Sequence, residues 1–175
     1  GTSFFPQITT PDSEIVGYLQ SYAEEKGLRP TLNGVKGKAR TFRLAKTEGH
    51  TNPIMDIIRQ YNLIDNKHIP QEYISNSEHN RLELLAGLLD TDGYASRNGY
   101  EIIQKNRSLA KQIKYVADTL GFRTNITEKS ARCNGKDCGK VYRVTINGDV
   151  WRIPSKVERK KISKEDVRKN KDWHL

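Results

Sequence analysis

The stretch Leu85-Ala86-Gly87-Leu88-Leu89-Asp90-Thr91-Asp92-Gly93 predicts an apolar helix that ends in two carboxylates. Ala86 and Gly87 have almost no side chain, so a second helix could approach closely there. Gly93 is expected to end the helix in the left-handed conformation that glycine tolerates. Asp92 would then lie at the negative end of the helix dipole, where a carboxylate is disfavoured by roughly 0.3–1 kcal/mol. A cation bound to Asp92 would relieve this repulsion.

Oxygen ligands at such a helix end suit Mg²⁺, which binds proteins through one or two carboxylates together with carbonyl oxygens and water. We therefore predict a hydrated Mg²⁺ site with Asp92 and Gly93 as its metal ligands. The alternative is a plain helix exit, since Asp and Gly are common turn residues.

An internal repeat relates two parts of the chain by a shift of 94 residues. Among the matched pairs are Ile8 with Ile102, Leu19 with Ile113, and Gly27 with Gly121. In both copies a short extended run leads into a helix that ends at the glycine, over about 13–26 and 108–120. The repeat predicts two halves of similar fold.

Two runs of alternating apolar and polar residues follow each of these glycines, which indicates a pair of strands. We expect strands over about 28–33, 39–46, 123–130 and 140–147. A helix closes each copy, over 53–61 with Pro53 at its first position, and over a shorter 149–153. The sequence thus predicts an α+β protein.

One face of each predicted sheet is polar. A twisted sheet with Arg, Lys, Asn and Thr on a concave face can lie in a major groove and contact base edges. Any antiparallel sheet with one solvated face gives the same alternation, so the pattern alone leaves both interpretations open. The predicted DNA-binding residues are Arg29, Thr31, Arg43, Lys105, Arg123, Asn125, Lys129, Arg143, Thr145 and Asn147.

The charge is basic and unevenly distributed. The 175 residues include 30 Lys and Arg against 21 Asp and Glu. Residues 1–92 carry 10 basic and 12 acidic side chains, whereas residues 93–175 carry 20 and 9. A positive field favours encounter with phosphate and gives salt-dependent affinity for nucleic acid. A solvated basic tail over 156–171 would explain part of the same excess.

The nine-residue stretch resembles the LAGLIDADG motif of homing endonucleases, with mild departures at Leu89 and Thr91. The resemblance continues through 66–73 and 99–123 and covers most of the chain, to about residue 162. It is similar to the endonuclease domains found inside inteins, such as that of the yeast vacuolar ATPase intein. The resemblance implies two pseudo-symmetric αββαββα halves with concave antiparallel sheets.

The halves implied by the resemblance are residues 1–76, which lack their motif helix, and 77–162, which contain it. Residues 163–175 would form a charged C-terminal connector. Gly1-Thr2-Ser3 parallels Gly93-Tyr94-Ala95, with a loop two residues shorter in the first copy. We therefore expect the first motif helix and its acid upstream of Gly1 or in a separate chain.

The resemblance also implies the catalytic residues. Asp92 would bind the divalent ion for one strand cut, and the absent partner acid would serve the other, with Asp90 in a structural or capping role. A lysine before an Ile-Pro pair suggests Lys67 as an active-site group. Lys160 holds the comparable place in the second copy, with Lys161 in reserve. Such lysines would stabilise phosphate charge or polarise water.

The function expected from these features is site-specific, Mg²⁺-dependent cleavage of double-stranded DNA. Two alternatives remain open: a DNA-binding module that has lost cleavage, and a homodimer that pairs through its single motif helix. No stretch approaches the roughly 18 apolar residues of a membrane span, and the N-terminus has no signal pattern. We expect a soluble, intracellular protein without a membrane partner, nuclear in a eukaryotic host.

Overall fold

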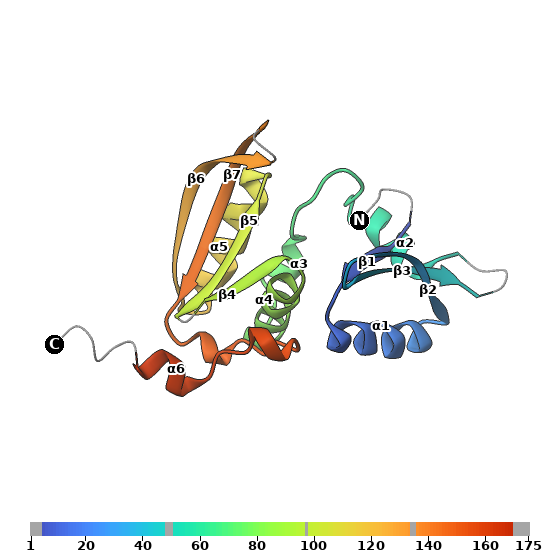
Figure 1. The fold of residues 1–175 in the computed structure, drawn as a ribbon, viewed down its shortest axis with the longest axis horizontal. Helices are drawn as coiled ribbons and strands as arrows, with labels where there is room; N and C mark the ends of the chain where they lie inside the picture. The colour runs from blue at the N-terminus through green and yellow to red at the C-terminus, as the bar shows by residue number, and fades with distance from the viewer. Residues whose placement is uncertain (1–4, 48–50, 97, 134–135, 170–175) are drawn as a thin grey trace. The chain divides into compact units, whose positions relative to one another are not determined.

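The computed structural model describes residues 5–47, 51–96, 98–133 and 136–169. The chain divides into two compact units (Figure 1): a first unit, Gly1–Lys67, and a second unit, His68–Leu175. Among the described residues, no helix is long and apolar enough to cross a bilayer.

The first unit is a three-stranded antiparallel sheet with helix α1 (Ser13–Glu25) packed on one face. Its strands, in the order β1-β3-β2, are β1 (Gln7–Thr10), β2 (Leu28–Lys36) and β3 (Ala39–Lys46). Apolar residues at helical spacing give α1 its buried face, because positions three and four apart lie on one side of a helix. The residues buried there are Ile15, Leu19 and Ala23.

Helix α2 (Pro53–Gln60) begins at the proline that the sequence indicated. The Asn52 side chain accepts hydrogen bonds from the main-chain nitrogens of Ile54 and Met55, at 3.1 and 3.4 Å. Its amide nitrogen also donates to the Leu44 carbonyl at 2.8 Å. Asn52 therefore caps the helix and fixes it to strand β3.

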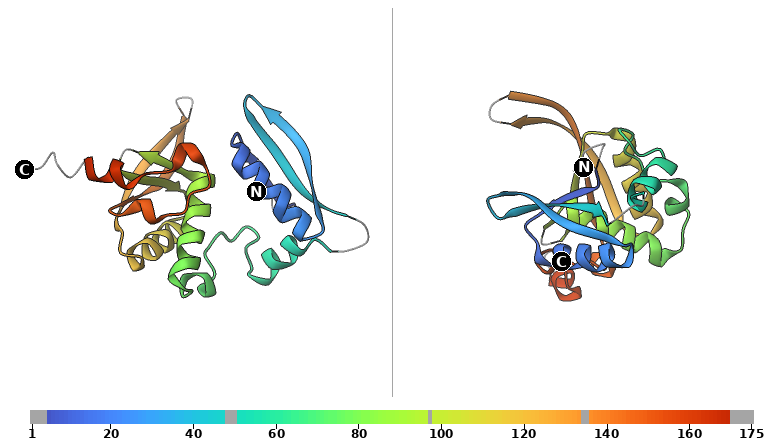
Figure 2. Two further views of the ribbon diagram at one scale, coloured as in Figure 1. Left: turned by 90° about the horizontal axis from the view of Figure 1, so that it is seen from below. Right: turned by 90° about the vertical axis from the view of Figure 1, so that its right-hand side faces the viewer.

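The second unit contains the motif helix and a four-stranded antiparallel sheet in the order β4-β5-β7-β6, with helix α5 on one face (Figure 2). Its helices and strands are α3 (Gln71–Ile74), α4 (Glu78–Asp92), β4 (Gly93–Ser96), β5 (Gly99–Gln104), α5 (Arg107–Thr119), β6 (Arg123–Cys133) and β7 (Lys136–Asn147). Two short 3-10 helices, η1 (Val150–Arg152) and η2 (Glu158–Lys160), precede α6 (Lys164–Lys169).

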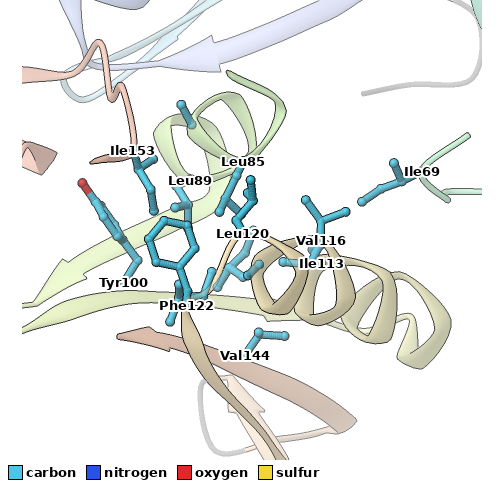
Figure 3. Packing of buried hydrophobic residues seen from close by; sticks show 14 of the residues in the cluster. Ile69, Leu85, Leu89, Tyr100, Ile113, Val116, Leu120, Phe122, Val144 and Ile153 are labelled. Atoms are coloured by element: carbon cyan, nitrogen blue, oxygen red, sulfur yellow. The ribbon is translucent and has the colours of Figure 1, made fainter. Parts of the chain in front are cut away.

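The hydrophobic core of the second unit lies between α4, α5 and the sheet (Figure 3). Leu85 and Leu89 of α4 are fully buried in the same cluster as Ile113 of α5 and Val144 of β7. Tyr100 of β5 is 1% exposed and belongs to the same cluster. The apolar face of helix α4 therefore packs against α5 and the sheet of the same unit.

The predicted repeat is visible in the backbone. Helices α1 and α5 each span 13 residues, and each is followed by a glycine with positive φ, Gly27 at 63° and Gly121 at 83°. A left-handed residue at this position ends a helix, and glycine adopts it without steric cost. The α+β fold class with antiparallel sheets is confirmed.

Several boundaries differ from the prediction. Strands β2, β6 and β7 run further than expected, and the second closing helix is a single 3-10 turn over Val150–Arg152. Strand β4 was not predicted. It pairs with β5 from Gly93↔Ile102 to Ser96↔Gly99, and its own four residues are too few to give a clear alternation.

Residues 68–76 pack with the second unit. Ile69 and Ile74 belong to its core cluster. The Gln112 side chain of α5 accepts from the Ile69 nitrogen at 3.0 Å and donates to the Ile69 carbonyl at 3.2 Å. This segment, which the resemblance assigned to the end of the first half, is anchored by burial and by hydrogen bonds to α5. The packing boundary therefore falls at Lys67, ahead of the expected boundary between the halves at residue 76.

Part of the predicted C-terminal connector is helical. Helix α6 begins with a capping box, in which the Ser163 hydroxyl accepts from the Asp166 nitrogen and the Asp166 carboxylate accepts from the Ser163 nitrogen. Val167 of α6 packs against the core of the second unit. Residues 170–175 lie outside the described residues.

Candidate active site and nucleic-acid interface

Helix α4 brings Asp90 and Asp92 to one helix end but into opposite environments. Asp90 is 4% exposed, whereas Asp92 is exposed. Residues two positions apart on an α-helix point about 200° apart, so one faces the unit while the other faces away from it. Among the described residues, none forms an ion pair with the Asp92 carboxylate.

The Asp90 carboxylate holds a distant loop against the helix. One of its oxygens accepts from the Ser155 hydroxyl and the other from the Lys156 main-chain nitrogen at 2.8 Å. Ser155 is itself 6% exposed. Buried carboxylates are expected to be satisfied in this way, since an unpaired buried charge is costly. Asp90 thus has the structural position expected from the sequence.

Lys160 lies at the same helix end. It is 3% exposed, and its ammonium group donates to the main-chain oxygens of Leu89 and Asp90, at 2.9 and 2.7 Å. The last carbonyls of a helix have no partner within the helix, and positive charge is favoured there. Lys160 therefore caps the C-terminal turn of α4. The reserve candidate Lys161 is exposed and pairs with Glu158.

Tyr100 fixes the backbone that carries Lys160. Its hydroxyl donates to the Lys160 main-chain oxygen at 2.8 Å, between strand β5 and η2. Burial raises the pKa of Tyr100 to about 12, and the negative charge of Asp90 acts in the same direction. Sequence reasoning missed Tyr100, because its partner lies 60 residues away and no local pattern connects them.

The expectation that Gly93 adopts a left-handed conformation is wrong. Its φ is −88° and its ψ 161°, which is extended backbone. The chain passes directly from α4 into β4, so no reversal is needed. The glycine is instead required by space: a Cβ there would lie 2.7 Å from the Cα and carbonyl oxygen of Leu89.

The two small residues of the motif, Ala86 and Gly87, lie in different environments. Ala86 is 2% exposed and belongs to the core of the second unit, whereas Gly87 is exposed. A Cβ built at Gly87 would meet nothing within 4 Å. Of the two small residues expected to admit a second helix, only Gly87 is available, because adjacent helical positions point about 100° apart.

The fit of the predicted metal site rests on the donor set at the end of α4. The exposed Asp92 carboxylate and the main-chain oxygen of Gly93 are oxygen ligands of the kind that a hydrated Mg²⁺ accepts. No group of three or more His, Cys, Asp or Glu side chains within the described residues could hold a metal ion. An ion held at this helix end by one protein carboxylate would complete its coordination with water.

Lys67 is exposed and is the last residue of the first unit. It follows a loop in which Asn62 and Asp65 have positive φ, at 52° and 51°. Its predicted catalytic role remains a prediction.

The register of the second sheet places its predicted DNA-binding residues on one face. Arg123 pairs with Asn147, Asn125 with Thr145, and Thr127 with Arg143. Val144 and Ile146, between them on β7, are fully buried on the opposite face. Lys129 continues the row beside Val141, and Lys105 is exposed one residue beyond β5. We call this solvated surface the open face of the second sheet.

The first sheet shows the same arrangement. Arg43 pairs with Gln7 on one side and Thr31 on the other, and Arg29 pairs with Ala45. The Arg43 guanidinium lies over the Phe5 ring, 3.5 Å from its centroid. The predicted residues Arg29, Thr31 and Arg43 therefore share one face, with Arg43 held against an aromatic ring.

Sequence reasoning missed the acidic residue Glu101 of the open face. Glu101 of β5 pairs with Thr145 of β7, and its carboxylate lies 3.4 Å from the Arg143 Nε. The alternation of β5, in which Tyr100 and Ile102 are buried, would have placed Glu101 there.

Comparison with known proteins gave one family and a set of similar structures. A family model described as a LAGLIDADG-like domain matches residues 79–169. A replicative DNA helicase, DnaB of Mycobacterium intracellulare, is 31% identical over 166 residues. That alignment covers 94% of this chain and 24% of the helicase, so the chain spans about a quarter of its relative's length.

Similar solved structures include those of the homing endonuclease I-DmoI. A variant of I-DmoI with its target DNA in the presence of Mg is 18% identical, with a TM-score of 0.55 over 81% of this chain and 72% of that chain. I-DmoI with DNA and Ca is 14% identical, with the same TM-score over 94% and 82%. I-DmoI with DNA and Mn is 17% identical. At these identities the likeness establishes the fold.

Proposed function

Because this chain belongs to the family of LAGLIDADG-like domains, we propose that it is a site-specific, metal-dependent endonuclease that hydrolyses both strands of a DNA duplex. The observation that carries the proposal is the end of helix α4. There an exposed carboxylate, Asp92, lies two residues beyond the carbonyl that receives the buried ammonium group of Lys160.

Asp92 is the proposed ligand of the divalent ion, together with the main-chain oxygen of Gly93. When bound, Mg²⁺ supplies an activated water and neutralises charge on the phosphate that is cut. The Asp92 carboxylate is exposed at the negative end of the α4 dipole, where a bound cation is favoured, and no described residue forms an ion pair with it. Its role is to hold the ion at a fixed point of a rigid helix.

Lys160 is proposed to stabilise the negative charge that develops on the phosphate. Its ammonium group is fixed by two carbonyl oxygens of α4, so it needs little reorganisation during the reaction. Tyr100 and Asp90 hold the segment around it. Lys67 is proposed as the lysine of the other active centre, on the strength of its place in the sequence.

Two polar sheet faces are proposed to bind the duplex. The residues are Arg29, Thr31 and Arg43 of the first unit and Lys105, Arg123, Asn125, Lys129, Arg143, Thr145 and Asn147 of the second. Most of the excess positive charge lies after residue 92, in the part of the chain that contains the larger sheet. A basic, exposed, hydrogen-bonding surface of this kind suits phosphate and base edges together.

Cleavage of both strands requires a second acid, because charge must be neutralised at two phosphates. We propose that this acid comes from a further motif helix, in a preceding segment or a separate chain, that packs on α4 at Gly87. The open space around Gly87 supports a close approach of two helices. Pairing of two copies through α4 is the alternative source.

An intein is the proposed setting of this domain. The alignment with 24% of a replicative DNA helicase supports a module that is carried within a longer polypeptide. The uninterrupted gene of the host protein would then contain the cleavage site.

The proposal is tested by selecting bound duplexes from a randomised pool without metal and then adding Mg²⁺, Mn²⁺ or Ca²⁺. We expect one enriched sequence and metal-dependent double-strand cleavage, with the first motif helix added as a peptide if the chain alone does not cut. The Asp92→Asn variant should bind the same sequence without cleaving it. Binding without cleavage in every mixture would favour a DNA-binding module, and no enrichment would refute both functions.

A further inference from the structure

Glu101 is unusual among the residues of the open face of the second sheet. Its neighbours there, in the described strands, are basic, neutral or apolar: Tyr94, Ile103, Arg123, Asn125, Thr127, Lys129, Val141, Arg143, Thr145 and Asn147. An isolated carboxylate on a surface that meets a polyanion would repel it. A reason for its presence is found in its contact with Arg143.

Glu101 and Arg143 form an ion pair within the sheet. The Glu101 carboxylate lies 3.4 Å from the Arg143 Nε, on neighbouring strands, and both side chains are 31% exposed. The Nε atom is buried and makes no hydrogen bond among the described residues. The contact with Glu101 is therefore made on the Nε side of the guanidinium, and no described residue accepts a hydrogen bond from its terminal N–H groups.

The ion pair with Glu101 favours neutral hydrogen-bond acceptors over phosphate as partners of Arg143. A phosphate would bring a full negative charge close to the Glu101 carboxylate, which opposes binding. The O6 and N7 atoms of guanine are neutral acceptors, and they match the two-pronged geometry of a guanidinium. An arginine already held by an ion pair also loses less conformational freedom when it binds.

We propose that Arg143 recognises the guanine of one G·C base pair through its terminal N–H groups, and that Glu101 is a positioning residue that orients its guanidinium. This inference rests on the proposed DNA-binding function and assigns to it a base preference. Thr127 and Thr145 flank the pair on the neighbouring and same strands, so the contact lies inside the sheet surface and not at its rim.

The test is selection of duplexes from a randomised pool by the full chain and by Arg143→Lys and Glu101→Gln, followed by affinities for the enriched duplex and its single-base variants. We expect one G·C position at which the wild-type chain discriminates by roughly 5- to 150-fold, the range of one bidentate base contact. Both variants should lose most of that discrimination and keep the preferences at other positions. Glu101→Gln should also bind unrelated duplexes equally well or better, since it removes a negative charge.

Two controls separate this role from others. Glu78→Gln removes the carboxylate of a comparable ion pair, with Arg152, at the start of α4 and should leave every base preference unchanged. Lys129→Ala removes a positive charge from the open face. It should weaken all duplexes alike and reduce the salt dependence of binding, which Arg143→Lys should not.

Equal weakening of all duplexes by Arg143→Lys, with the G·C preference intact, would overturn the inference while leaving DNA binding in place. The same holds if Glu101→Gln retains full discrimination at that position. If the wild-type chain enriches no sequence, the proposed function itself fails, and the base assignment fails with it.

Discussion

The ammonium group of Lys160 lies 2.7 Å from the main-chain oxygen of Asp90, so the end of the motif helix is completed by a residue that is 70 positions away in the chain. Leu89 provides the second carbonyl, at 2.9 Å. The buried Lys160 therefore caps helix α4, and it lies at the same helix end as the proposed metal ligand Asp92.

Replacing Lys160 by methionine should lower both stability and cleavage. Two helix carbonyls would lose their charged donor inside the core, which costs about 1–3 kcal/mol of unfolding free energy. Loss of a fixed electrostatic group should slow single-turnover cleavage by about 100-fold or more. Urea unfolding and cleavage of the selected duplex measure the two effects. Lys161→Met is the control, and equal behaviour of the two variants would contradict the assignment.

Replacing Asp92 by asparagine should abolish cleavage without loss of stability. The carboxylate is exposed at the negative end of α4, where its removal is favourable by roughly 0.3–1 kcal/mol. The variant should therefore unfold at the same or a slightly higher urea concentration. A variant that still cleaves would show that Asp92 is not the ligand, and a clearly destabilised variant would contradict the predicted effect of the helix dipole.

Replacing Asp90 by alanine should, in contrast to Asp92→Asn, lower the stability of the fold. The buried carboxylate accepts from Ser155 and from the Lys156 main chain, and its loss leaves both donors without a partner. We expect a loss of about 2–4 kcal/mol in unfolding free energy, as for a charged hydrogen-bonding group with two partners. Ser155→Ala tests one half of this contact. Stability equal to that of Asp92→Asn would contradict the structural role.

The two motif glycines should differ in their tolerance of alanine. Gly93→Ala places a methyl group 2.7 Å from Leu89 main-chain atoms and should destabilise the fold by about 1–3 kcal/mol. Gly87→Ala meets no atom within 4 Å and should stabilise α4 by up to about 1 kcal/mol, since alanine is the better helix former. Thermal unfolding measures both. The same Gly87 variant should weaken binding of an added motif helix.

Tyr100 should make stability fall at alkaline pH. Its pKa is raised to about 12 by burial, so the folded chain disfavours the phenolate. The contribution is intact below pH 10 and is lost as the pH rises towards 12, because the unfolded chain ionises first. Tyr100→Phe should show a flatter dependence over this interval in urea titrations, and should be less stable by about 1 kcal/mol at pH 8. Parallel pH profiles would contradict it.

Much of the architecture could be predicted because its signals are local. The glycines Gly27 and Gly121, at the ends of two helices, set the period of the repeat. Pro53 and its preceding asparagine mark the start of α2, and side-chain alternation assigns the two faces of each sheet. Each of these features depends on residues that are close together in the sequence.

The parts that could not be predicted depend on contacts between distant residues. The bond from Tyr100 to the Lys160 backbone spans 60 positions, and the bonds from Asp90 to its loop span 65 and 66. The prediction of a left-handed Gly93 was wrong because α4 leads directly into a strand, and a glycine after a helix does not by itself indicate whether the chain reverses there. Glu101 was missed because its partner, Arg143, lies on another strand of the sheet.

The separation in sequence between α4 and its cap, Lys160, also determines when the end of the helix can be completed during synthesis. A ribosome makes Asp92 well before Lys160, and single domains acquire their long-range contacts only once the necessary chain has emerged. A nascent chain that stops in β7 carries the motif acid on a helix whose last carbonyls have no ammonium partner. The geometry at the acid is therefore a late product of translation, and truncated chains lack it.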